Sequence, residues 1–437
     1  MTKKIQYQAV DVQSLELQEL IHEWEPGARL VVGVDVAKQK FLAALSDSKG
    51  ENRRIVRFEH PRQTLAFVEL LDGLSKAGRA VEVVMEPTGT YGDALRFQLE
   101  LRRIPVFRVN NKHVHDAAEL FDRSASKHDA KDACVIAWLH THQRSARWEA
   151  LSQERRRIRA LVAQRELFDV PARRLVAQME PLLARHFPEL EKFFDLSRRK
   201  TPYRLLEKFG SAAAIAAAGT ENVRAFLQKA SCRVPDQDMV RDLMLAARTT
   251  SGVELVDDEL QLVQMMASEI LRLFKMREQV DARLTQVGSE ISAVKAMRPC
   301  LGAVTAAVVF AYLGSPNDYG SAAALEKAAG LNLIERSSGV NAGTKHLSKR
   351  GAAPVRKYLF MAAMRLIQSD PIVKAWYRAR TSFRSDAKMK AVIAVQRKLC
   401  RALFHVAAGN DFDASKLFDT RRLKVEAVSP HFGGRMN

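Results

Sequence analysis

Residues 30–37 read LVVGVDVA, a short and mostly β-branched run that contains one glycine and one aspartate. An apolar run of this length is typical of a strand buried inside a sheet. Asp35 stands in it between Val34 and Val36, where a charged carboxylate is unfavourable unless it has a partner. The stretch therefore predicts a central strand with a carboxylate that interacts with something specific.

The residues around this strand predict an α/β domain. Residues 40–47 (KFLAALSD) and 53–60 (RRIVRFEH) predict two further strands joined by a polar turn. Helices and strands then alternate: a helix at 61–78, a strand at 80–87, a helix at 91–104, a strand at 105–110 and two helices over about 113–142. Three meandering strands followed by this alternation describe a mixed sheet of the ribonuclease-H-like plan. We expect it over residues 29–145, after an amphipathic lead-in at 1–28.

Three more carboxylates lie on elements that this plan brings towards Asp35. Glu86 ends the fourth strand, and Asp129 and Asp132 stand three apart on one face at the start of a helix. In this plan the first and fourth strands are neighbours, and the closing helix crosses near their ends. Each residue alone also fits a plainer role, such as a turn residue for Glu86 or a partner of the helix dipole for Asp129.

Four converging carboxylates repel one another unless a divalent cation lies between them, and hard oxygen ligands suit Mg²⁺, with Mn²⁺ as a substitute. Two such ions about 4 Å apart form a site for phosphoryl transfer. Sugar-kinase and actin-like ATPases share the opening strand but need glycine-rich phosphate loops after it. Residues 33–40 read GVDVAKQK, which disfavours an ATPase.

The charge of the whole chain indicates a polyanionic partner. The 437 residues include 69 Lys and Arg against 50 Asp and Glu, a formal net charge of +19, and nucleic acid is the leading explanation. A merely solubilising excess is the alternative. The four cysteines are far apart and form no CxxC pair, which argues against a zinc site or a disulfide framework. We expect a cytoplasmic, nucleoid-associated bacterial protein without a membrane segment.

Residues 146–290 predict long helices, with a helical insertion at about 190–260. Nine arginines fall between residues 144 and 174 with few acids nearby, which favours phosphate contact. The candidates for nucleic-acid binding there are Arg155, Arg156, Arg157 and Arg159. From Val263 to Val287 a heptad seam has one polar core position, Arg277, and favours self-association as a coiled coil. Antiparallel pairing with residues 151–185 of the same chain is the alternative.

Residues 291–437 predict a mainly helical domain. The stretch 298–314 (RPCLGAVTAAVVFAYLG) has the form of a helix-hairpin-helix turn, with Gly302 and Thr305 placed for close approach to a phosphate. Residues 333–351 (LIERSSGVNAGTKHLSKRG) are polar and basic, and predict either a solvated loop or a reactive site. Further candidate contacts to nucleic acid are Arg336, Lys345, Lys349, Arg350 and Arg356.

Six stretches, taken in order, resemble one known family. They are GVDVAKQKF, MEPTGTYG, KHDAKDACVIAWL, RPCLGAVTAA, AAGLNLIERSSG and LSKRGAAPVRKYLFMAA. Together they resemble the DEDD-type insertion-sequence transposases, which have a RuvC-like N-terminal domain and a C-terminal transposase domain with a reactive serine. Pilin-gene invertases are relatives. The resemblance covers about residues 28–180 and 290–415.

The resemblance implies roles for individual residues. Asp35, Glu86, Asp129 and Asp132 match the family's metal ligands. Ser338 matches its nucleophile, a serine directly before a glycine and after an Ala-Gly-Leu stretch, and Ser337 is the second choice.

The resemblance also implies partners. The serine would form a covalent phosphoserine link to DNA, and another subunit of a dimer or tetramer would supply the carboxylate domain. A structured guide RNA would pair with donor and target DNA. Two alternatives remain: a RuvC-like nuclease or Holliday-junction resolvase with a structural serine, or a non-catalytic nucleic-acid-binding protein.

Overall fold

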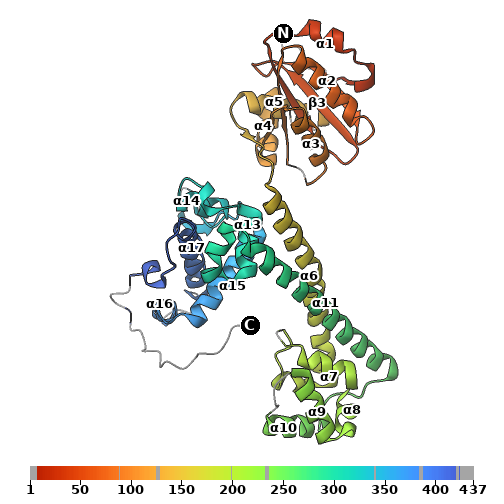
Figure 1. The fold of residues 1–437 in the computed structure, drawn as a ribbon, viewed down its shortest axis with the longest axis vertical. Coiled ribbons are helices and arrows are strands. Elements are labelled where there is room, and N and C mark those ends of the chain that lie inside the picture. Colours follow the sequence, from red (N-terminus) through yellow and green to blue (C-terminus); the bar gives the residue numbers. More distant parts are fainter. Residues whose placement is uncertain are drawn as a thin grey trace. The chain divides into compact units, whose positions relative to one another are not determined.

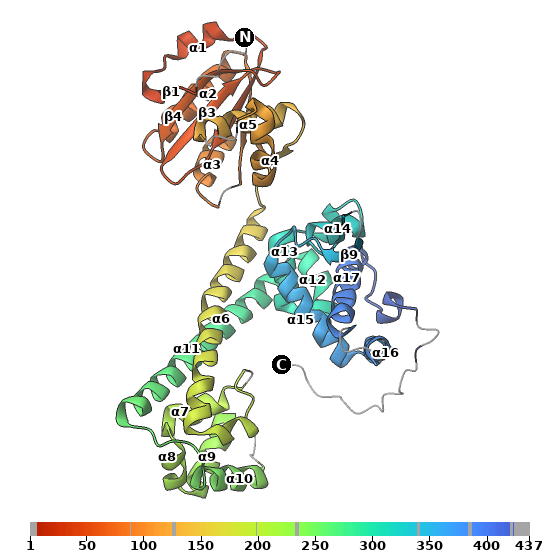
Figure 2. The ribbon, with the colours of Figure 1, turned by 180° about the vertical axis from the view of Figure 1, so that it is seen from behind.

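The computed structural model describes residues 7–87, 89–124, 128–197, 199–231, 236–338, 341–382, 387–419 and 423. At residues 231, 336–338 and 341–344 it describes the main chain alone. The chain divides into two compact units, Met1–Ala150 and Leu151–Asn437, and each is described by itself. Figures 1 and 2 show the ribbon of both from opposite sides.

The first unit is built on a seven-stranded mixed sheet in the order β1-β4-β3-β2-β5-β6-β7. Its strands are β1 (Ala9–Asp11), β2 (Arg29–Asp35), β3 (Lys40–Ser46), β4 (Asn52–Glu59), β5 (Ala80–Met85), β6 (Val106–Arg108) and β7 (Ala146–Arg147). Its helices are α1 (Leu17–Glu23), α2 (Thr64–Lys76), α3 (Asp93–Leu101), α4 (Asn111–Asp122) and α5 (Asp129–Thr141). The central strand predicted from LVVGVDVA is β2, which pairs antiparallel with β3 and parallel with β5. The mixed α/β sheet is therefore confirmed.

Helices cover both faces of this sheet. Successive side chains of a strand point to opposite faces. Leu30, Val32 and Val34 of β2 lie in one core with residues of α1, α2 and α3. Val31 lies in a second core with residues of α4 and α5, on the opposite face. Asp35 follows Val31 at an even spacing, so it lies on the face that α5 covers.

Helix α5 approaches β2 closely because residue 33 is glycine. A Cβ atom at Gly33 would lie 2.2 Å from the carbonyl oxygen of Ala133 and 2.5 Å from the main-chain nitrogen of Ala137. Real Cβ atoms essentially never make such short contacts, so any larger residue would push α5 away from the sheet. Gly33 thus sets the spacing between the strand that carries Asp35 and the helix that carries Asp129 and Asp132.

The residues expected to form a separate lead-in belong to the first unit. Ala9–Asp11 pairs parallel with β4 as the edge strand of the sheet. Leu20 of α1 and Trp24 are fully or almost fully buried in the core with α2. Three residues are too short a strand to stand out in a sequence, and so this strand was missed.

The second unit begins with a pair of long helices. Helix α6 (Gln153–His186) and helix α11 (Asp257–Ser289) lie side by side along their length. Ion pairs near their two ends join Arg157 to Glu290 at 3.5 Å and Arg185 to Glu259 at 3.6 Å, so the helices are antiparallel. The seam residues Val263, Ile270 and Leu273 are buried with residues of α6 in this unit.

The heptad seam of α11 is therefore paired with α6 of the same chain, which was the alternative interpretation of the sequence. Val280, Leu284 and Val287, at the other end of the seam, pack with Ile158 and Val162 of α6. Because α6 covers the seam, its apolar pattern needs no second copy of the chain. Self-association, the preferred interpretation of the sequence, is therefore not needed to bury this seam.

The predicted insertion forms four helices. They pack at the end of the pair where α6 ends and α11 begins. They are α7 (Thr201–Phe209), α8 (Ala212–Ala218), α9 (Thr220–Ser231) and α10 (Gln237–Arg248). Tyr203, Leu205 and Ile215 from this group pack with Met179 of α6 and Phe274 of α11 in one core. The insertion is thus a helical subdomain built onto α6 and α11.

The C-terminal part of this unit is mainly helical, as predicted. Its helices are α12 (Ser292–Leu301), α13 (Ala303–Leu313), α14 (Ala322–Ala328), α15 (Ala353–Ser369), α16 (Pro371–Thr381) and α17 (Ala387–Ala407). The stretch expected as a polar loop instead contains a β-hairpin of β8 (Leu333–Ser338) and β9 (Asn341–Leu347). Its composition suggested a loop because few of its side chains are apolar, whereas its strands pair through main-chain hydrogen bonds.

No helix in the described part of the chain is long and apolar enough to cross a lipid bilayer.

We predict that Gly33→Ala destabilises the first unit by about 1–3 kcal/mol, because the added methyl group overpacks the contact between β2 and α5. Chemical unfolding of the full chain, followed by tryptophan fluorescence, measures this, since three of the four tryptophans, Trp24, Trp138 and Trp148, lie in the first unit. Gly320→Ala is the matched control, because nothing lies within 4 Å of a Cβ atom there. Equal stability of the two variants would contradict the close approach.

Candidate active site

Asp35 and Glu86 come from the carboxyl ends of two neighbouring parallel strands. Val34 of β2 is in register with Met85 of β5, so Asp35, the last residue of β2, lies beside Glu86, which directly follows β5. Both are half-buried. The carboxyl ends of parallel strands are a common position for sites in α/β proteins.

Helix α5 brings the other two carboxylates to the same region. Asp129 is its first residue and is exposed, and Asp132 lies one turn further on and is half-buried. The N-cap is His128, whose ring nitrogen Nδ1 accepts a hydrogen bond of 3.2 Å from the main-chain nitrogen of Ala130. The contact of α5 with Gly33 fixes where this helix begins relative to β2.

The other three carboxylates all act electrostatically on Asp35. Burial, followed in order of effect by the charges of Asp132, Glu86 and Asp129, raises the pKa of Asp35 to about 7. A hydrogen bond from the main-chain nitrogen of Val36 acts in the opposite direction and is outweighed. The sequence prediction that these four residues converge is consistent with this coupling.

The donor set fits a hard divalent cation, although a complete cage is not preformed. All four groups offer carboxylate oxygens, the ligands that Mg²⁺ and Mn²⁺ prefer. Within the described residues, no group of three or more His, Cys, Asp or Glu side chains is already arranged to hold a metal ion. Mutual repulsion opposes such an arrangement while no cation compensates the charges. Mg²⁺ also keeps several water ligands, so it needs only one or two carboxylates at first.

A buried lysine that the sequence did not reveal anchors the start of α5. Lys131 is 1% exposed, and its Nζ contacts Asp122 Oδ1 at 2.7 Å and donates to the carbonyl oxygen of Ser124 at 2.6 Å. Tyr7 donates to the other oxygen of Asp122 at 2.6 Å. Burial opposes ionisation of Asp122, but hydrogen bonds from Lys131 and Tyr7 outweigh it and keep its pKa below the usual value. Nothing in KHDAKDA distinguishes this lysine from a solvated one.

Comparison with known proteins identifies the chain. Residues 32–188 match a family of DEDD transposases of the IS110 type, described as "Transposase", and residues 296–378 match the "Transposase IS116/IS110/IS902 family". The chain belongs to the DEDD-type insertion-sequence transposases. The resemblance inferred from the six sequence stretches is therefore confirmed, and residues 189–295 lie between the two matched ranges.

Curated relatives of this transposase come from other insertion elements. The "Insertion element IS110 uncharacterized 43.6 kDa protein" of Streptomyces coelicolor is 26% identical over 315 residues, which are 69% of this chain and 75% of the relative. The "Insertion element IS116 uncharacterized 44.8 kDa protein" of Streptomyces clavuligerus is 26% identical over 347 residues, 77% of this chain and 84% of the relative. A 42 kDa protein of insertion element IS900 from Mycobacterium paratuberculosis is 25% identical over 304 residues, 68% and 75% of the two chains.

The two candidate nucleophiles of the transposase lie at the turn end of the β-hairpin. Ser338 is the last residue of β8 and pairs with Asn341 of β9, and an irregularity of register separates it from the pair Arg336–Thr344. Ser337 lies at this irregular step. The side chains of Arg336, Ser337 and Ser338 lie outside the described residues, as does Gly339.

The base of this hairpin is anchored where α14 ends. The main-chain nitrogen of Ser348 donates to the carbonyl oxygen of Asn332 at 2.9 Å. Arg356, a predicted nucleic-acid contact, donates to the carbonyl oxygen of Gly351 at 2.6 Å and is half-buried. Arg356 therefore has a structural role in the connection from the hairpin to α15. Lys345, Lys349 and Arg350 are exposed.

A single glycine, Gly302, joins α12 to α13 at the predicted turn. The two candidate residues, Gly302 and Thr305, differ in how accessible they are to nucleic acid. Gly302 alone separates α12 from α13 and has a φ of 75°, a conformation that favours glycine. A Cβ atom there would lie 3.2 Å from a guanidinium nitrogen of Arg365, whose Nη2 donates to the carbonyl oxygen of Leu301. Thr305 is 8% exposed and lies in the domain interior, so its side chain is a poor candidate for contact with nucleic acid.

Several arginines of α6 pair within the protein, contrary to the sequence prediction. Arg155 donates to the carbonyl oxygens of Ala311 and Tyr312 at 3.2 and 2.6 Å, and so satisfies two acceptors at the C-terminal end of α13. Arg157 forms a surface ion pair with Glu290 at 3.5 Å, and the guanidinium of Arg159 lies 5.3 Å from the ring centroid of Tyr312. Arg156, Arg157 and Arg159 nevertheless remain exposed.

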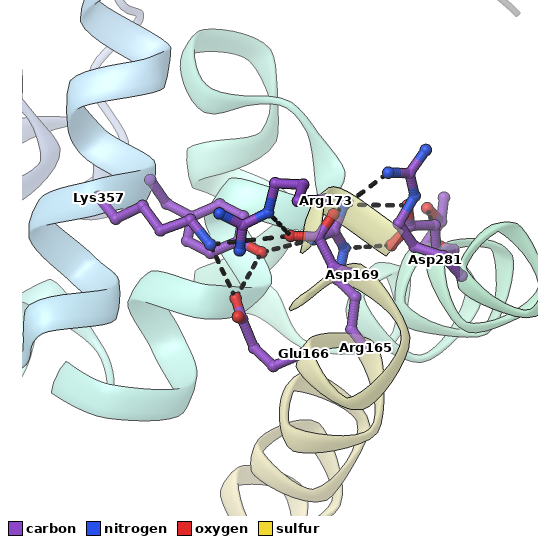
Figure 3. A network of polar contacts seen from close by, with 9 residues as sticks. Arg165, Glu166, Asp169, Arg173, Asp281 and Lys357 are labelled. Carbon is purple, nitrogen blue, oxygen red and sulfur yellow. Dashed lines mark hydrogen bonds and ion pairs between the residues drawn. The ribbon is translucent and has the colours of Figure 1, made fainter. Parts of the chain in front are cut away.

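A network of charges joins α6, α11 and α15 (Figure 3). Arg165 donates to Asp281 Oδ1 at 2.6 Å and to the hydroxyl of Tyr358 at 2.6 Å. Asp169, only 10% exposed at its side chain, accepts from Arg173 at 3.0 Å and from Arg277 at 3.2 Å. The α6 arginines have few acidic residues near them in sequence, and α11, about a hundred residues further along the chain, supplies part of their acidic partners. The network also explains the one polar residue in the heptad seam, because Arg277 is a partner of Asp169.

We predict that Asp35→Asn raises the thermal stability of the metal-free protein at pH 8 and abolishes its stabilisation by Mg²⁺. The fold raises the pKa of Asp35 from the usual 3.8 of an aspartate to about 7, so the charged form is unfavourable and stability is lost as pH rises through 7. Asparagine removes the free-energy cost of a charged carboxylate at residue 35. After solvent screening of this half-buried group, that cost is on the order of 1–2 kcal/mol. Below about pH 4 both proteins carry a neutral side chain at residue 35, and the difference should vanish.

Differential scanning fluorimetry with and without Mg²⁺ measures both effects. Asp116→Asn is the control, since this exposed carboxylate of α4 pairs with Lys112 at 3.8 Å on the surface. An Mg²⁺-dependent shift that persists in Asp35→Asn would remove Asp35 from the ligand set.

Proposed function

We propose that this transposase cleaves and exchanges DNA strands with two chemical groups: Mg²⁺ bound by Asp35, Glu86, Asp129 and Asp132, and Ser338 as nucleophile. The observation that carries the proposal is the register of β2 with β5, which sets Asp35 beside Glu86 under a helix that begins with the other two carboxylates. Mn²⁺ is expected to substitute for Mg²⁺ because it has the same preference for oxygen ligands.

In the proposed reaction, the hydroxyl oxygen of Ser338 attacks a phosphodiester phosphorus. An Oγ–P bond forms and one P–O bond of the DNA strand breaks, and the proton that the serine loses balances the one that the leaving oxygen gains. When bound, the divalent ions would neutralise charge on the phosphate oxygens and assist the attacking hydroxyl. A serine hydroxyl is a weak nucleophile without such assistance. The exposed cations Lys345, Lys349 and Arg350 would stabilise the phosphate near the hairpin.

We further propose that the protein acts as a homo-oligomer, a dimer or tetramer, in which the carboxylate domain of one subunit serves the serine of another. The family resemblance motivates this arrangement and the guidance of the protein by a structured RNA that pairs with donor and target DNA. The formal net charge of +19 is sufficient for both nucleic acids. Because the seam between α6 and α11 is filled within one chain, we propose that the subunits meet on other surfaces.

We predict that Ser338→Ala abolishes the covalent protein–DNA adduct on a nicked suicide substrate and reduces strand cleavage at least about a thousandfold. Denaturing gels of labelled DNA measure both. Ser337→Ala is the matched control and should keep the adduct. The reverse pattern would assign the nucleophile to Ser337. Cleavage at the normal rate in both variants would favour a RuvC-like nuclease with structural serines.

We predict that Asp129→Ala reduces Mg²⁺-dependent cleavage by about 100-fold or more, because it removes a ligand of the ions that stabilise the transition state. Asp129 is exposed at the start of α5, so its loss should leave the fold intact. Cleavage rates at several Mg²⁺ concentrations test the proposal. Asp116→Ala on α4 serves as control. Activity equal to that of the unmodified protein would refute the metal assignment for Asp129.

A further inference from the structure

A pocket of about 550 Å³ lies in the C-terminal domain, between α17 and the segment that follows it. The chain turns after α17 at Gly409, with a φ of 94°, and residues 410–413, 416 and 417 form the opposite wall. The amino group of Lys398 on the helix donates to the carbonyl oxygen of Leu417 and so links the two walls. The pocket is thus formed by one continuous stretch of chain and contains none of the four carboxylates.

The helical wall of this pocket carries two cations and a histidine in one stripe. Lys398, Arg401 and His405 are all exposed and follow one another at spacings of three and four residues, which places them on one face of α17. The stripe is about 10 Å long at 1.5 Å per residue. Lys416 is also exposed and contributes a further positive charge from the opposite wall.

Protein carboxylates compensate these charges only in part. The buried Glu326 accepts a hydrogen bond of 2.6 Å from Arg397, whereas Arg401 lies 3.9 Å from the other oxygen of the same carboxylate. The Nζ of Lys398 bonds to a main-chain carbonyl. Burial, and then the neighbouring charge of Arg401, lower the pKa of Lys398, as expected for like charges that lack a full counter-ion. A bound anion would remove this repulsion.

The rest of the lining suits a flat and partly apolar group. Val406, Phe412 and Leu417 supply apolar surface beside the cations. Of the two acids in the lining, Asp413 already accepts hydrogen bonds from the main-chain nitrogen and the hydroxyl of Ser415, at 2.9 and 2.6 Å. Asp411 is exposed and can accept hydrogen bonds from amino groups of a base. The volume exceeds what a lone phosphate fills and falls in the range of small-molecule sites.

We infer that this pocket binds an unpaired nucleotide of a nucleic-acid strand, with its phosphate on Lys398 and Arg401 and its base against the apolar surface around Phe412. Phosphate and base together match the two kinds of lining. A base inside a duplex is stacked on its neighbours and cannot enter a pocket unless it is flipped out. The site is therefore specific for single-stranded segments. It concerns binding and does not depend on the serine chemistry.

Fluorescence anisotropy with labelled oligothymidylate, oligouridylate and a DNA duplex tests this inference on the full chain. The double substitution Lys398→Gln/Arg401→Gln should weaken single-strand binding by about tenfold and reduce its salt dependence, while duplex binding changes less than about threefold. The larger loss, on the DNA or on the RNA strand, identifies the natural source of the nucleotide. Ser338→Ala should bind like the unmodified protein, which separates this test from the proposed reaction.

The matched control is Lys374→Gln/Arg380→Gln, which removes two exposed cations of α16 outside the pocket. Equal losses in the pocket and control variants would show general charge attraction and overturn the inference, as would equal losses for duplex and single strands. Lys416→Gln provides a second test, because its exposed side chain leaves the fold unaffected. It too should weaken single-strand binding selectively, and unchanged binding in both pocket variants would refute the site.

Discussion

The close contact between β2 and α5 at Gly33 is the constraint on which the arrangement of the first unit depends. A helix cannot approach a strand this closely over any residue with a side chain, because the Cβ atom would overlap the main chain of Ala133. This spacing brings the start of α5 to the carboxyl ends of β2 and β5. Charge repulsion among four carboxylates opposes the arrangement, as the raised pKa of Asp35 indicates. Packing energy from the two cores beside the sheet therefore holds together groups that would otherwise separate.

Much of the first unit could be predicted from sequence because its signals are local. A β-branched run with an internal aspartate and a strand that ends in Glu86 each place one carboxylate, and a helix with acids three residues apart places two. Lys131 could not be predicted, since its burial depends on Asp122 and Tyr7, which meet it only in the folded chain. The edge strand Ala9–Asp11 could not be predicted for a related reason. Its three residues form a strand because they pair with β4, and their own sequence pattern does not indicate this pairing.

In the second unit the sequence predicted the helices better than it predicted which parts of the chain they contact. The heptad seam correctly indicated a helix that needs a partner, but periodicity alone does not distinguish another chain from α6. The arginines of α6 looked unpaired because Asp281 and Glu290 are distant in sequence. The β-hairpin was hidden because polar residues on a small exposed ribbon resemble a loop. In each case the missing information was the identity of a long-range neighbour.

The ionic network at Asp169 has a consequence for how the family can vary. Buried charges must keep their partners, so a shift of α6 along α11 by one turn would separate Asp169 from Arg277 and Arg165 from Asp281. The network therefore fixes the alignment of the two helices independently of the chain that connects them. The connecting subdomain, residues 187–256, can then lengthen, shorten or be replaced during evolution without moving the C-terminal domain out of place. We expect insertions within this subdomain to leave α6 and α11 aligned, because ion pairs outside the subdomain set that alignment.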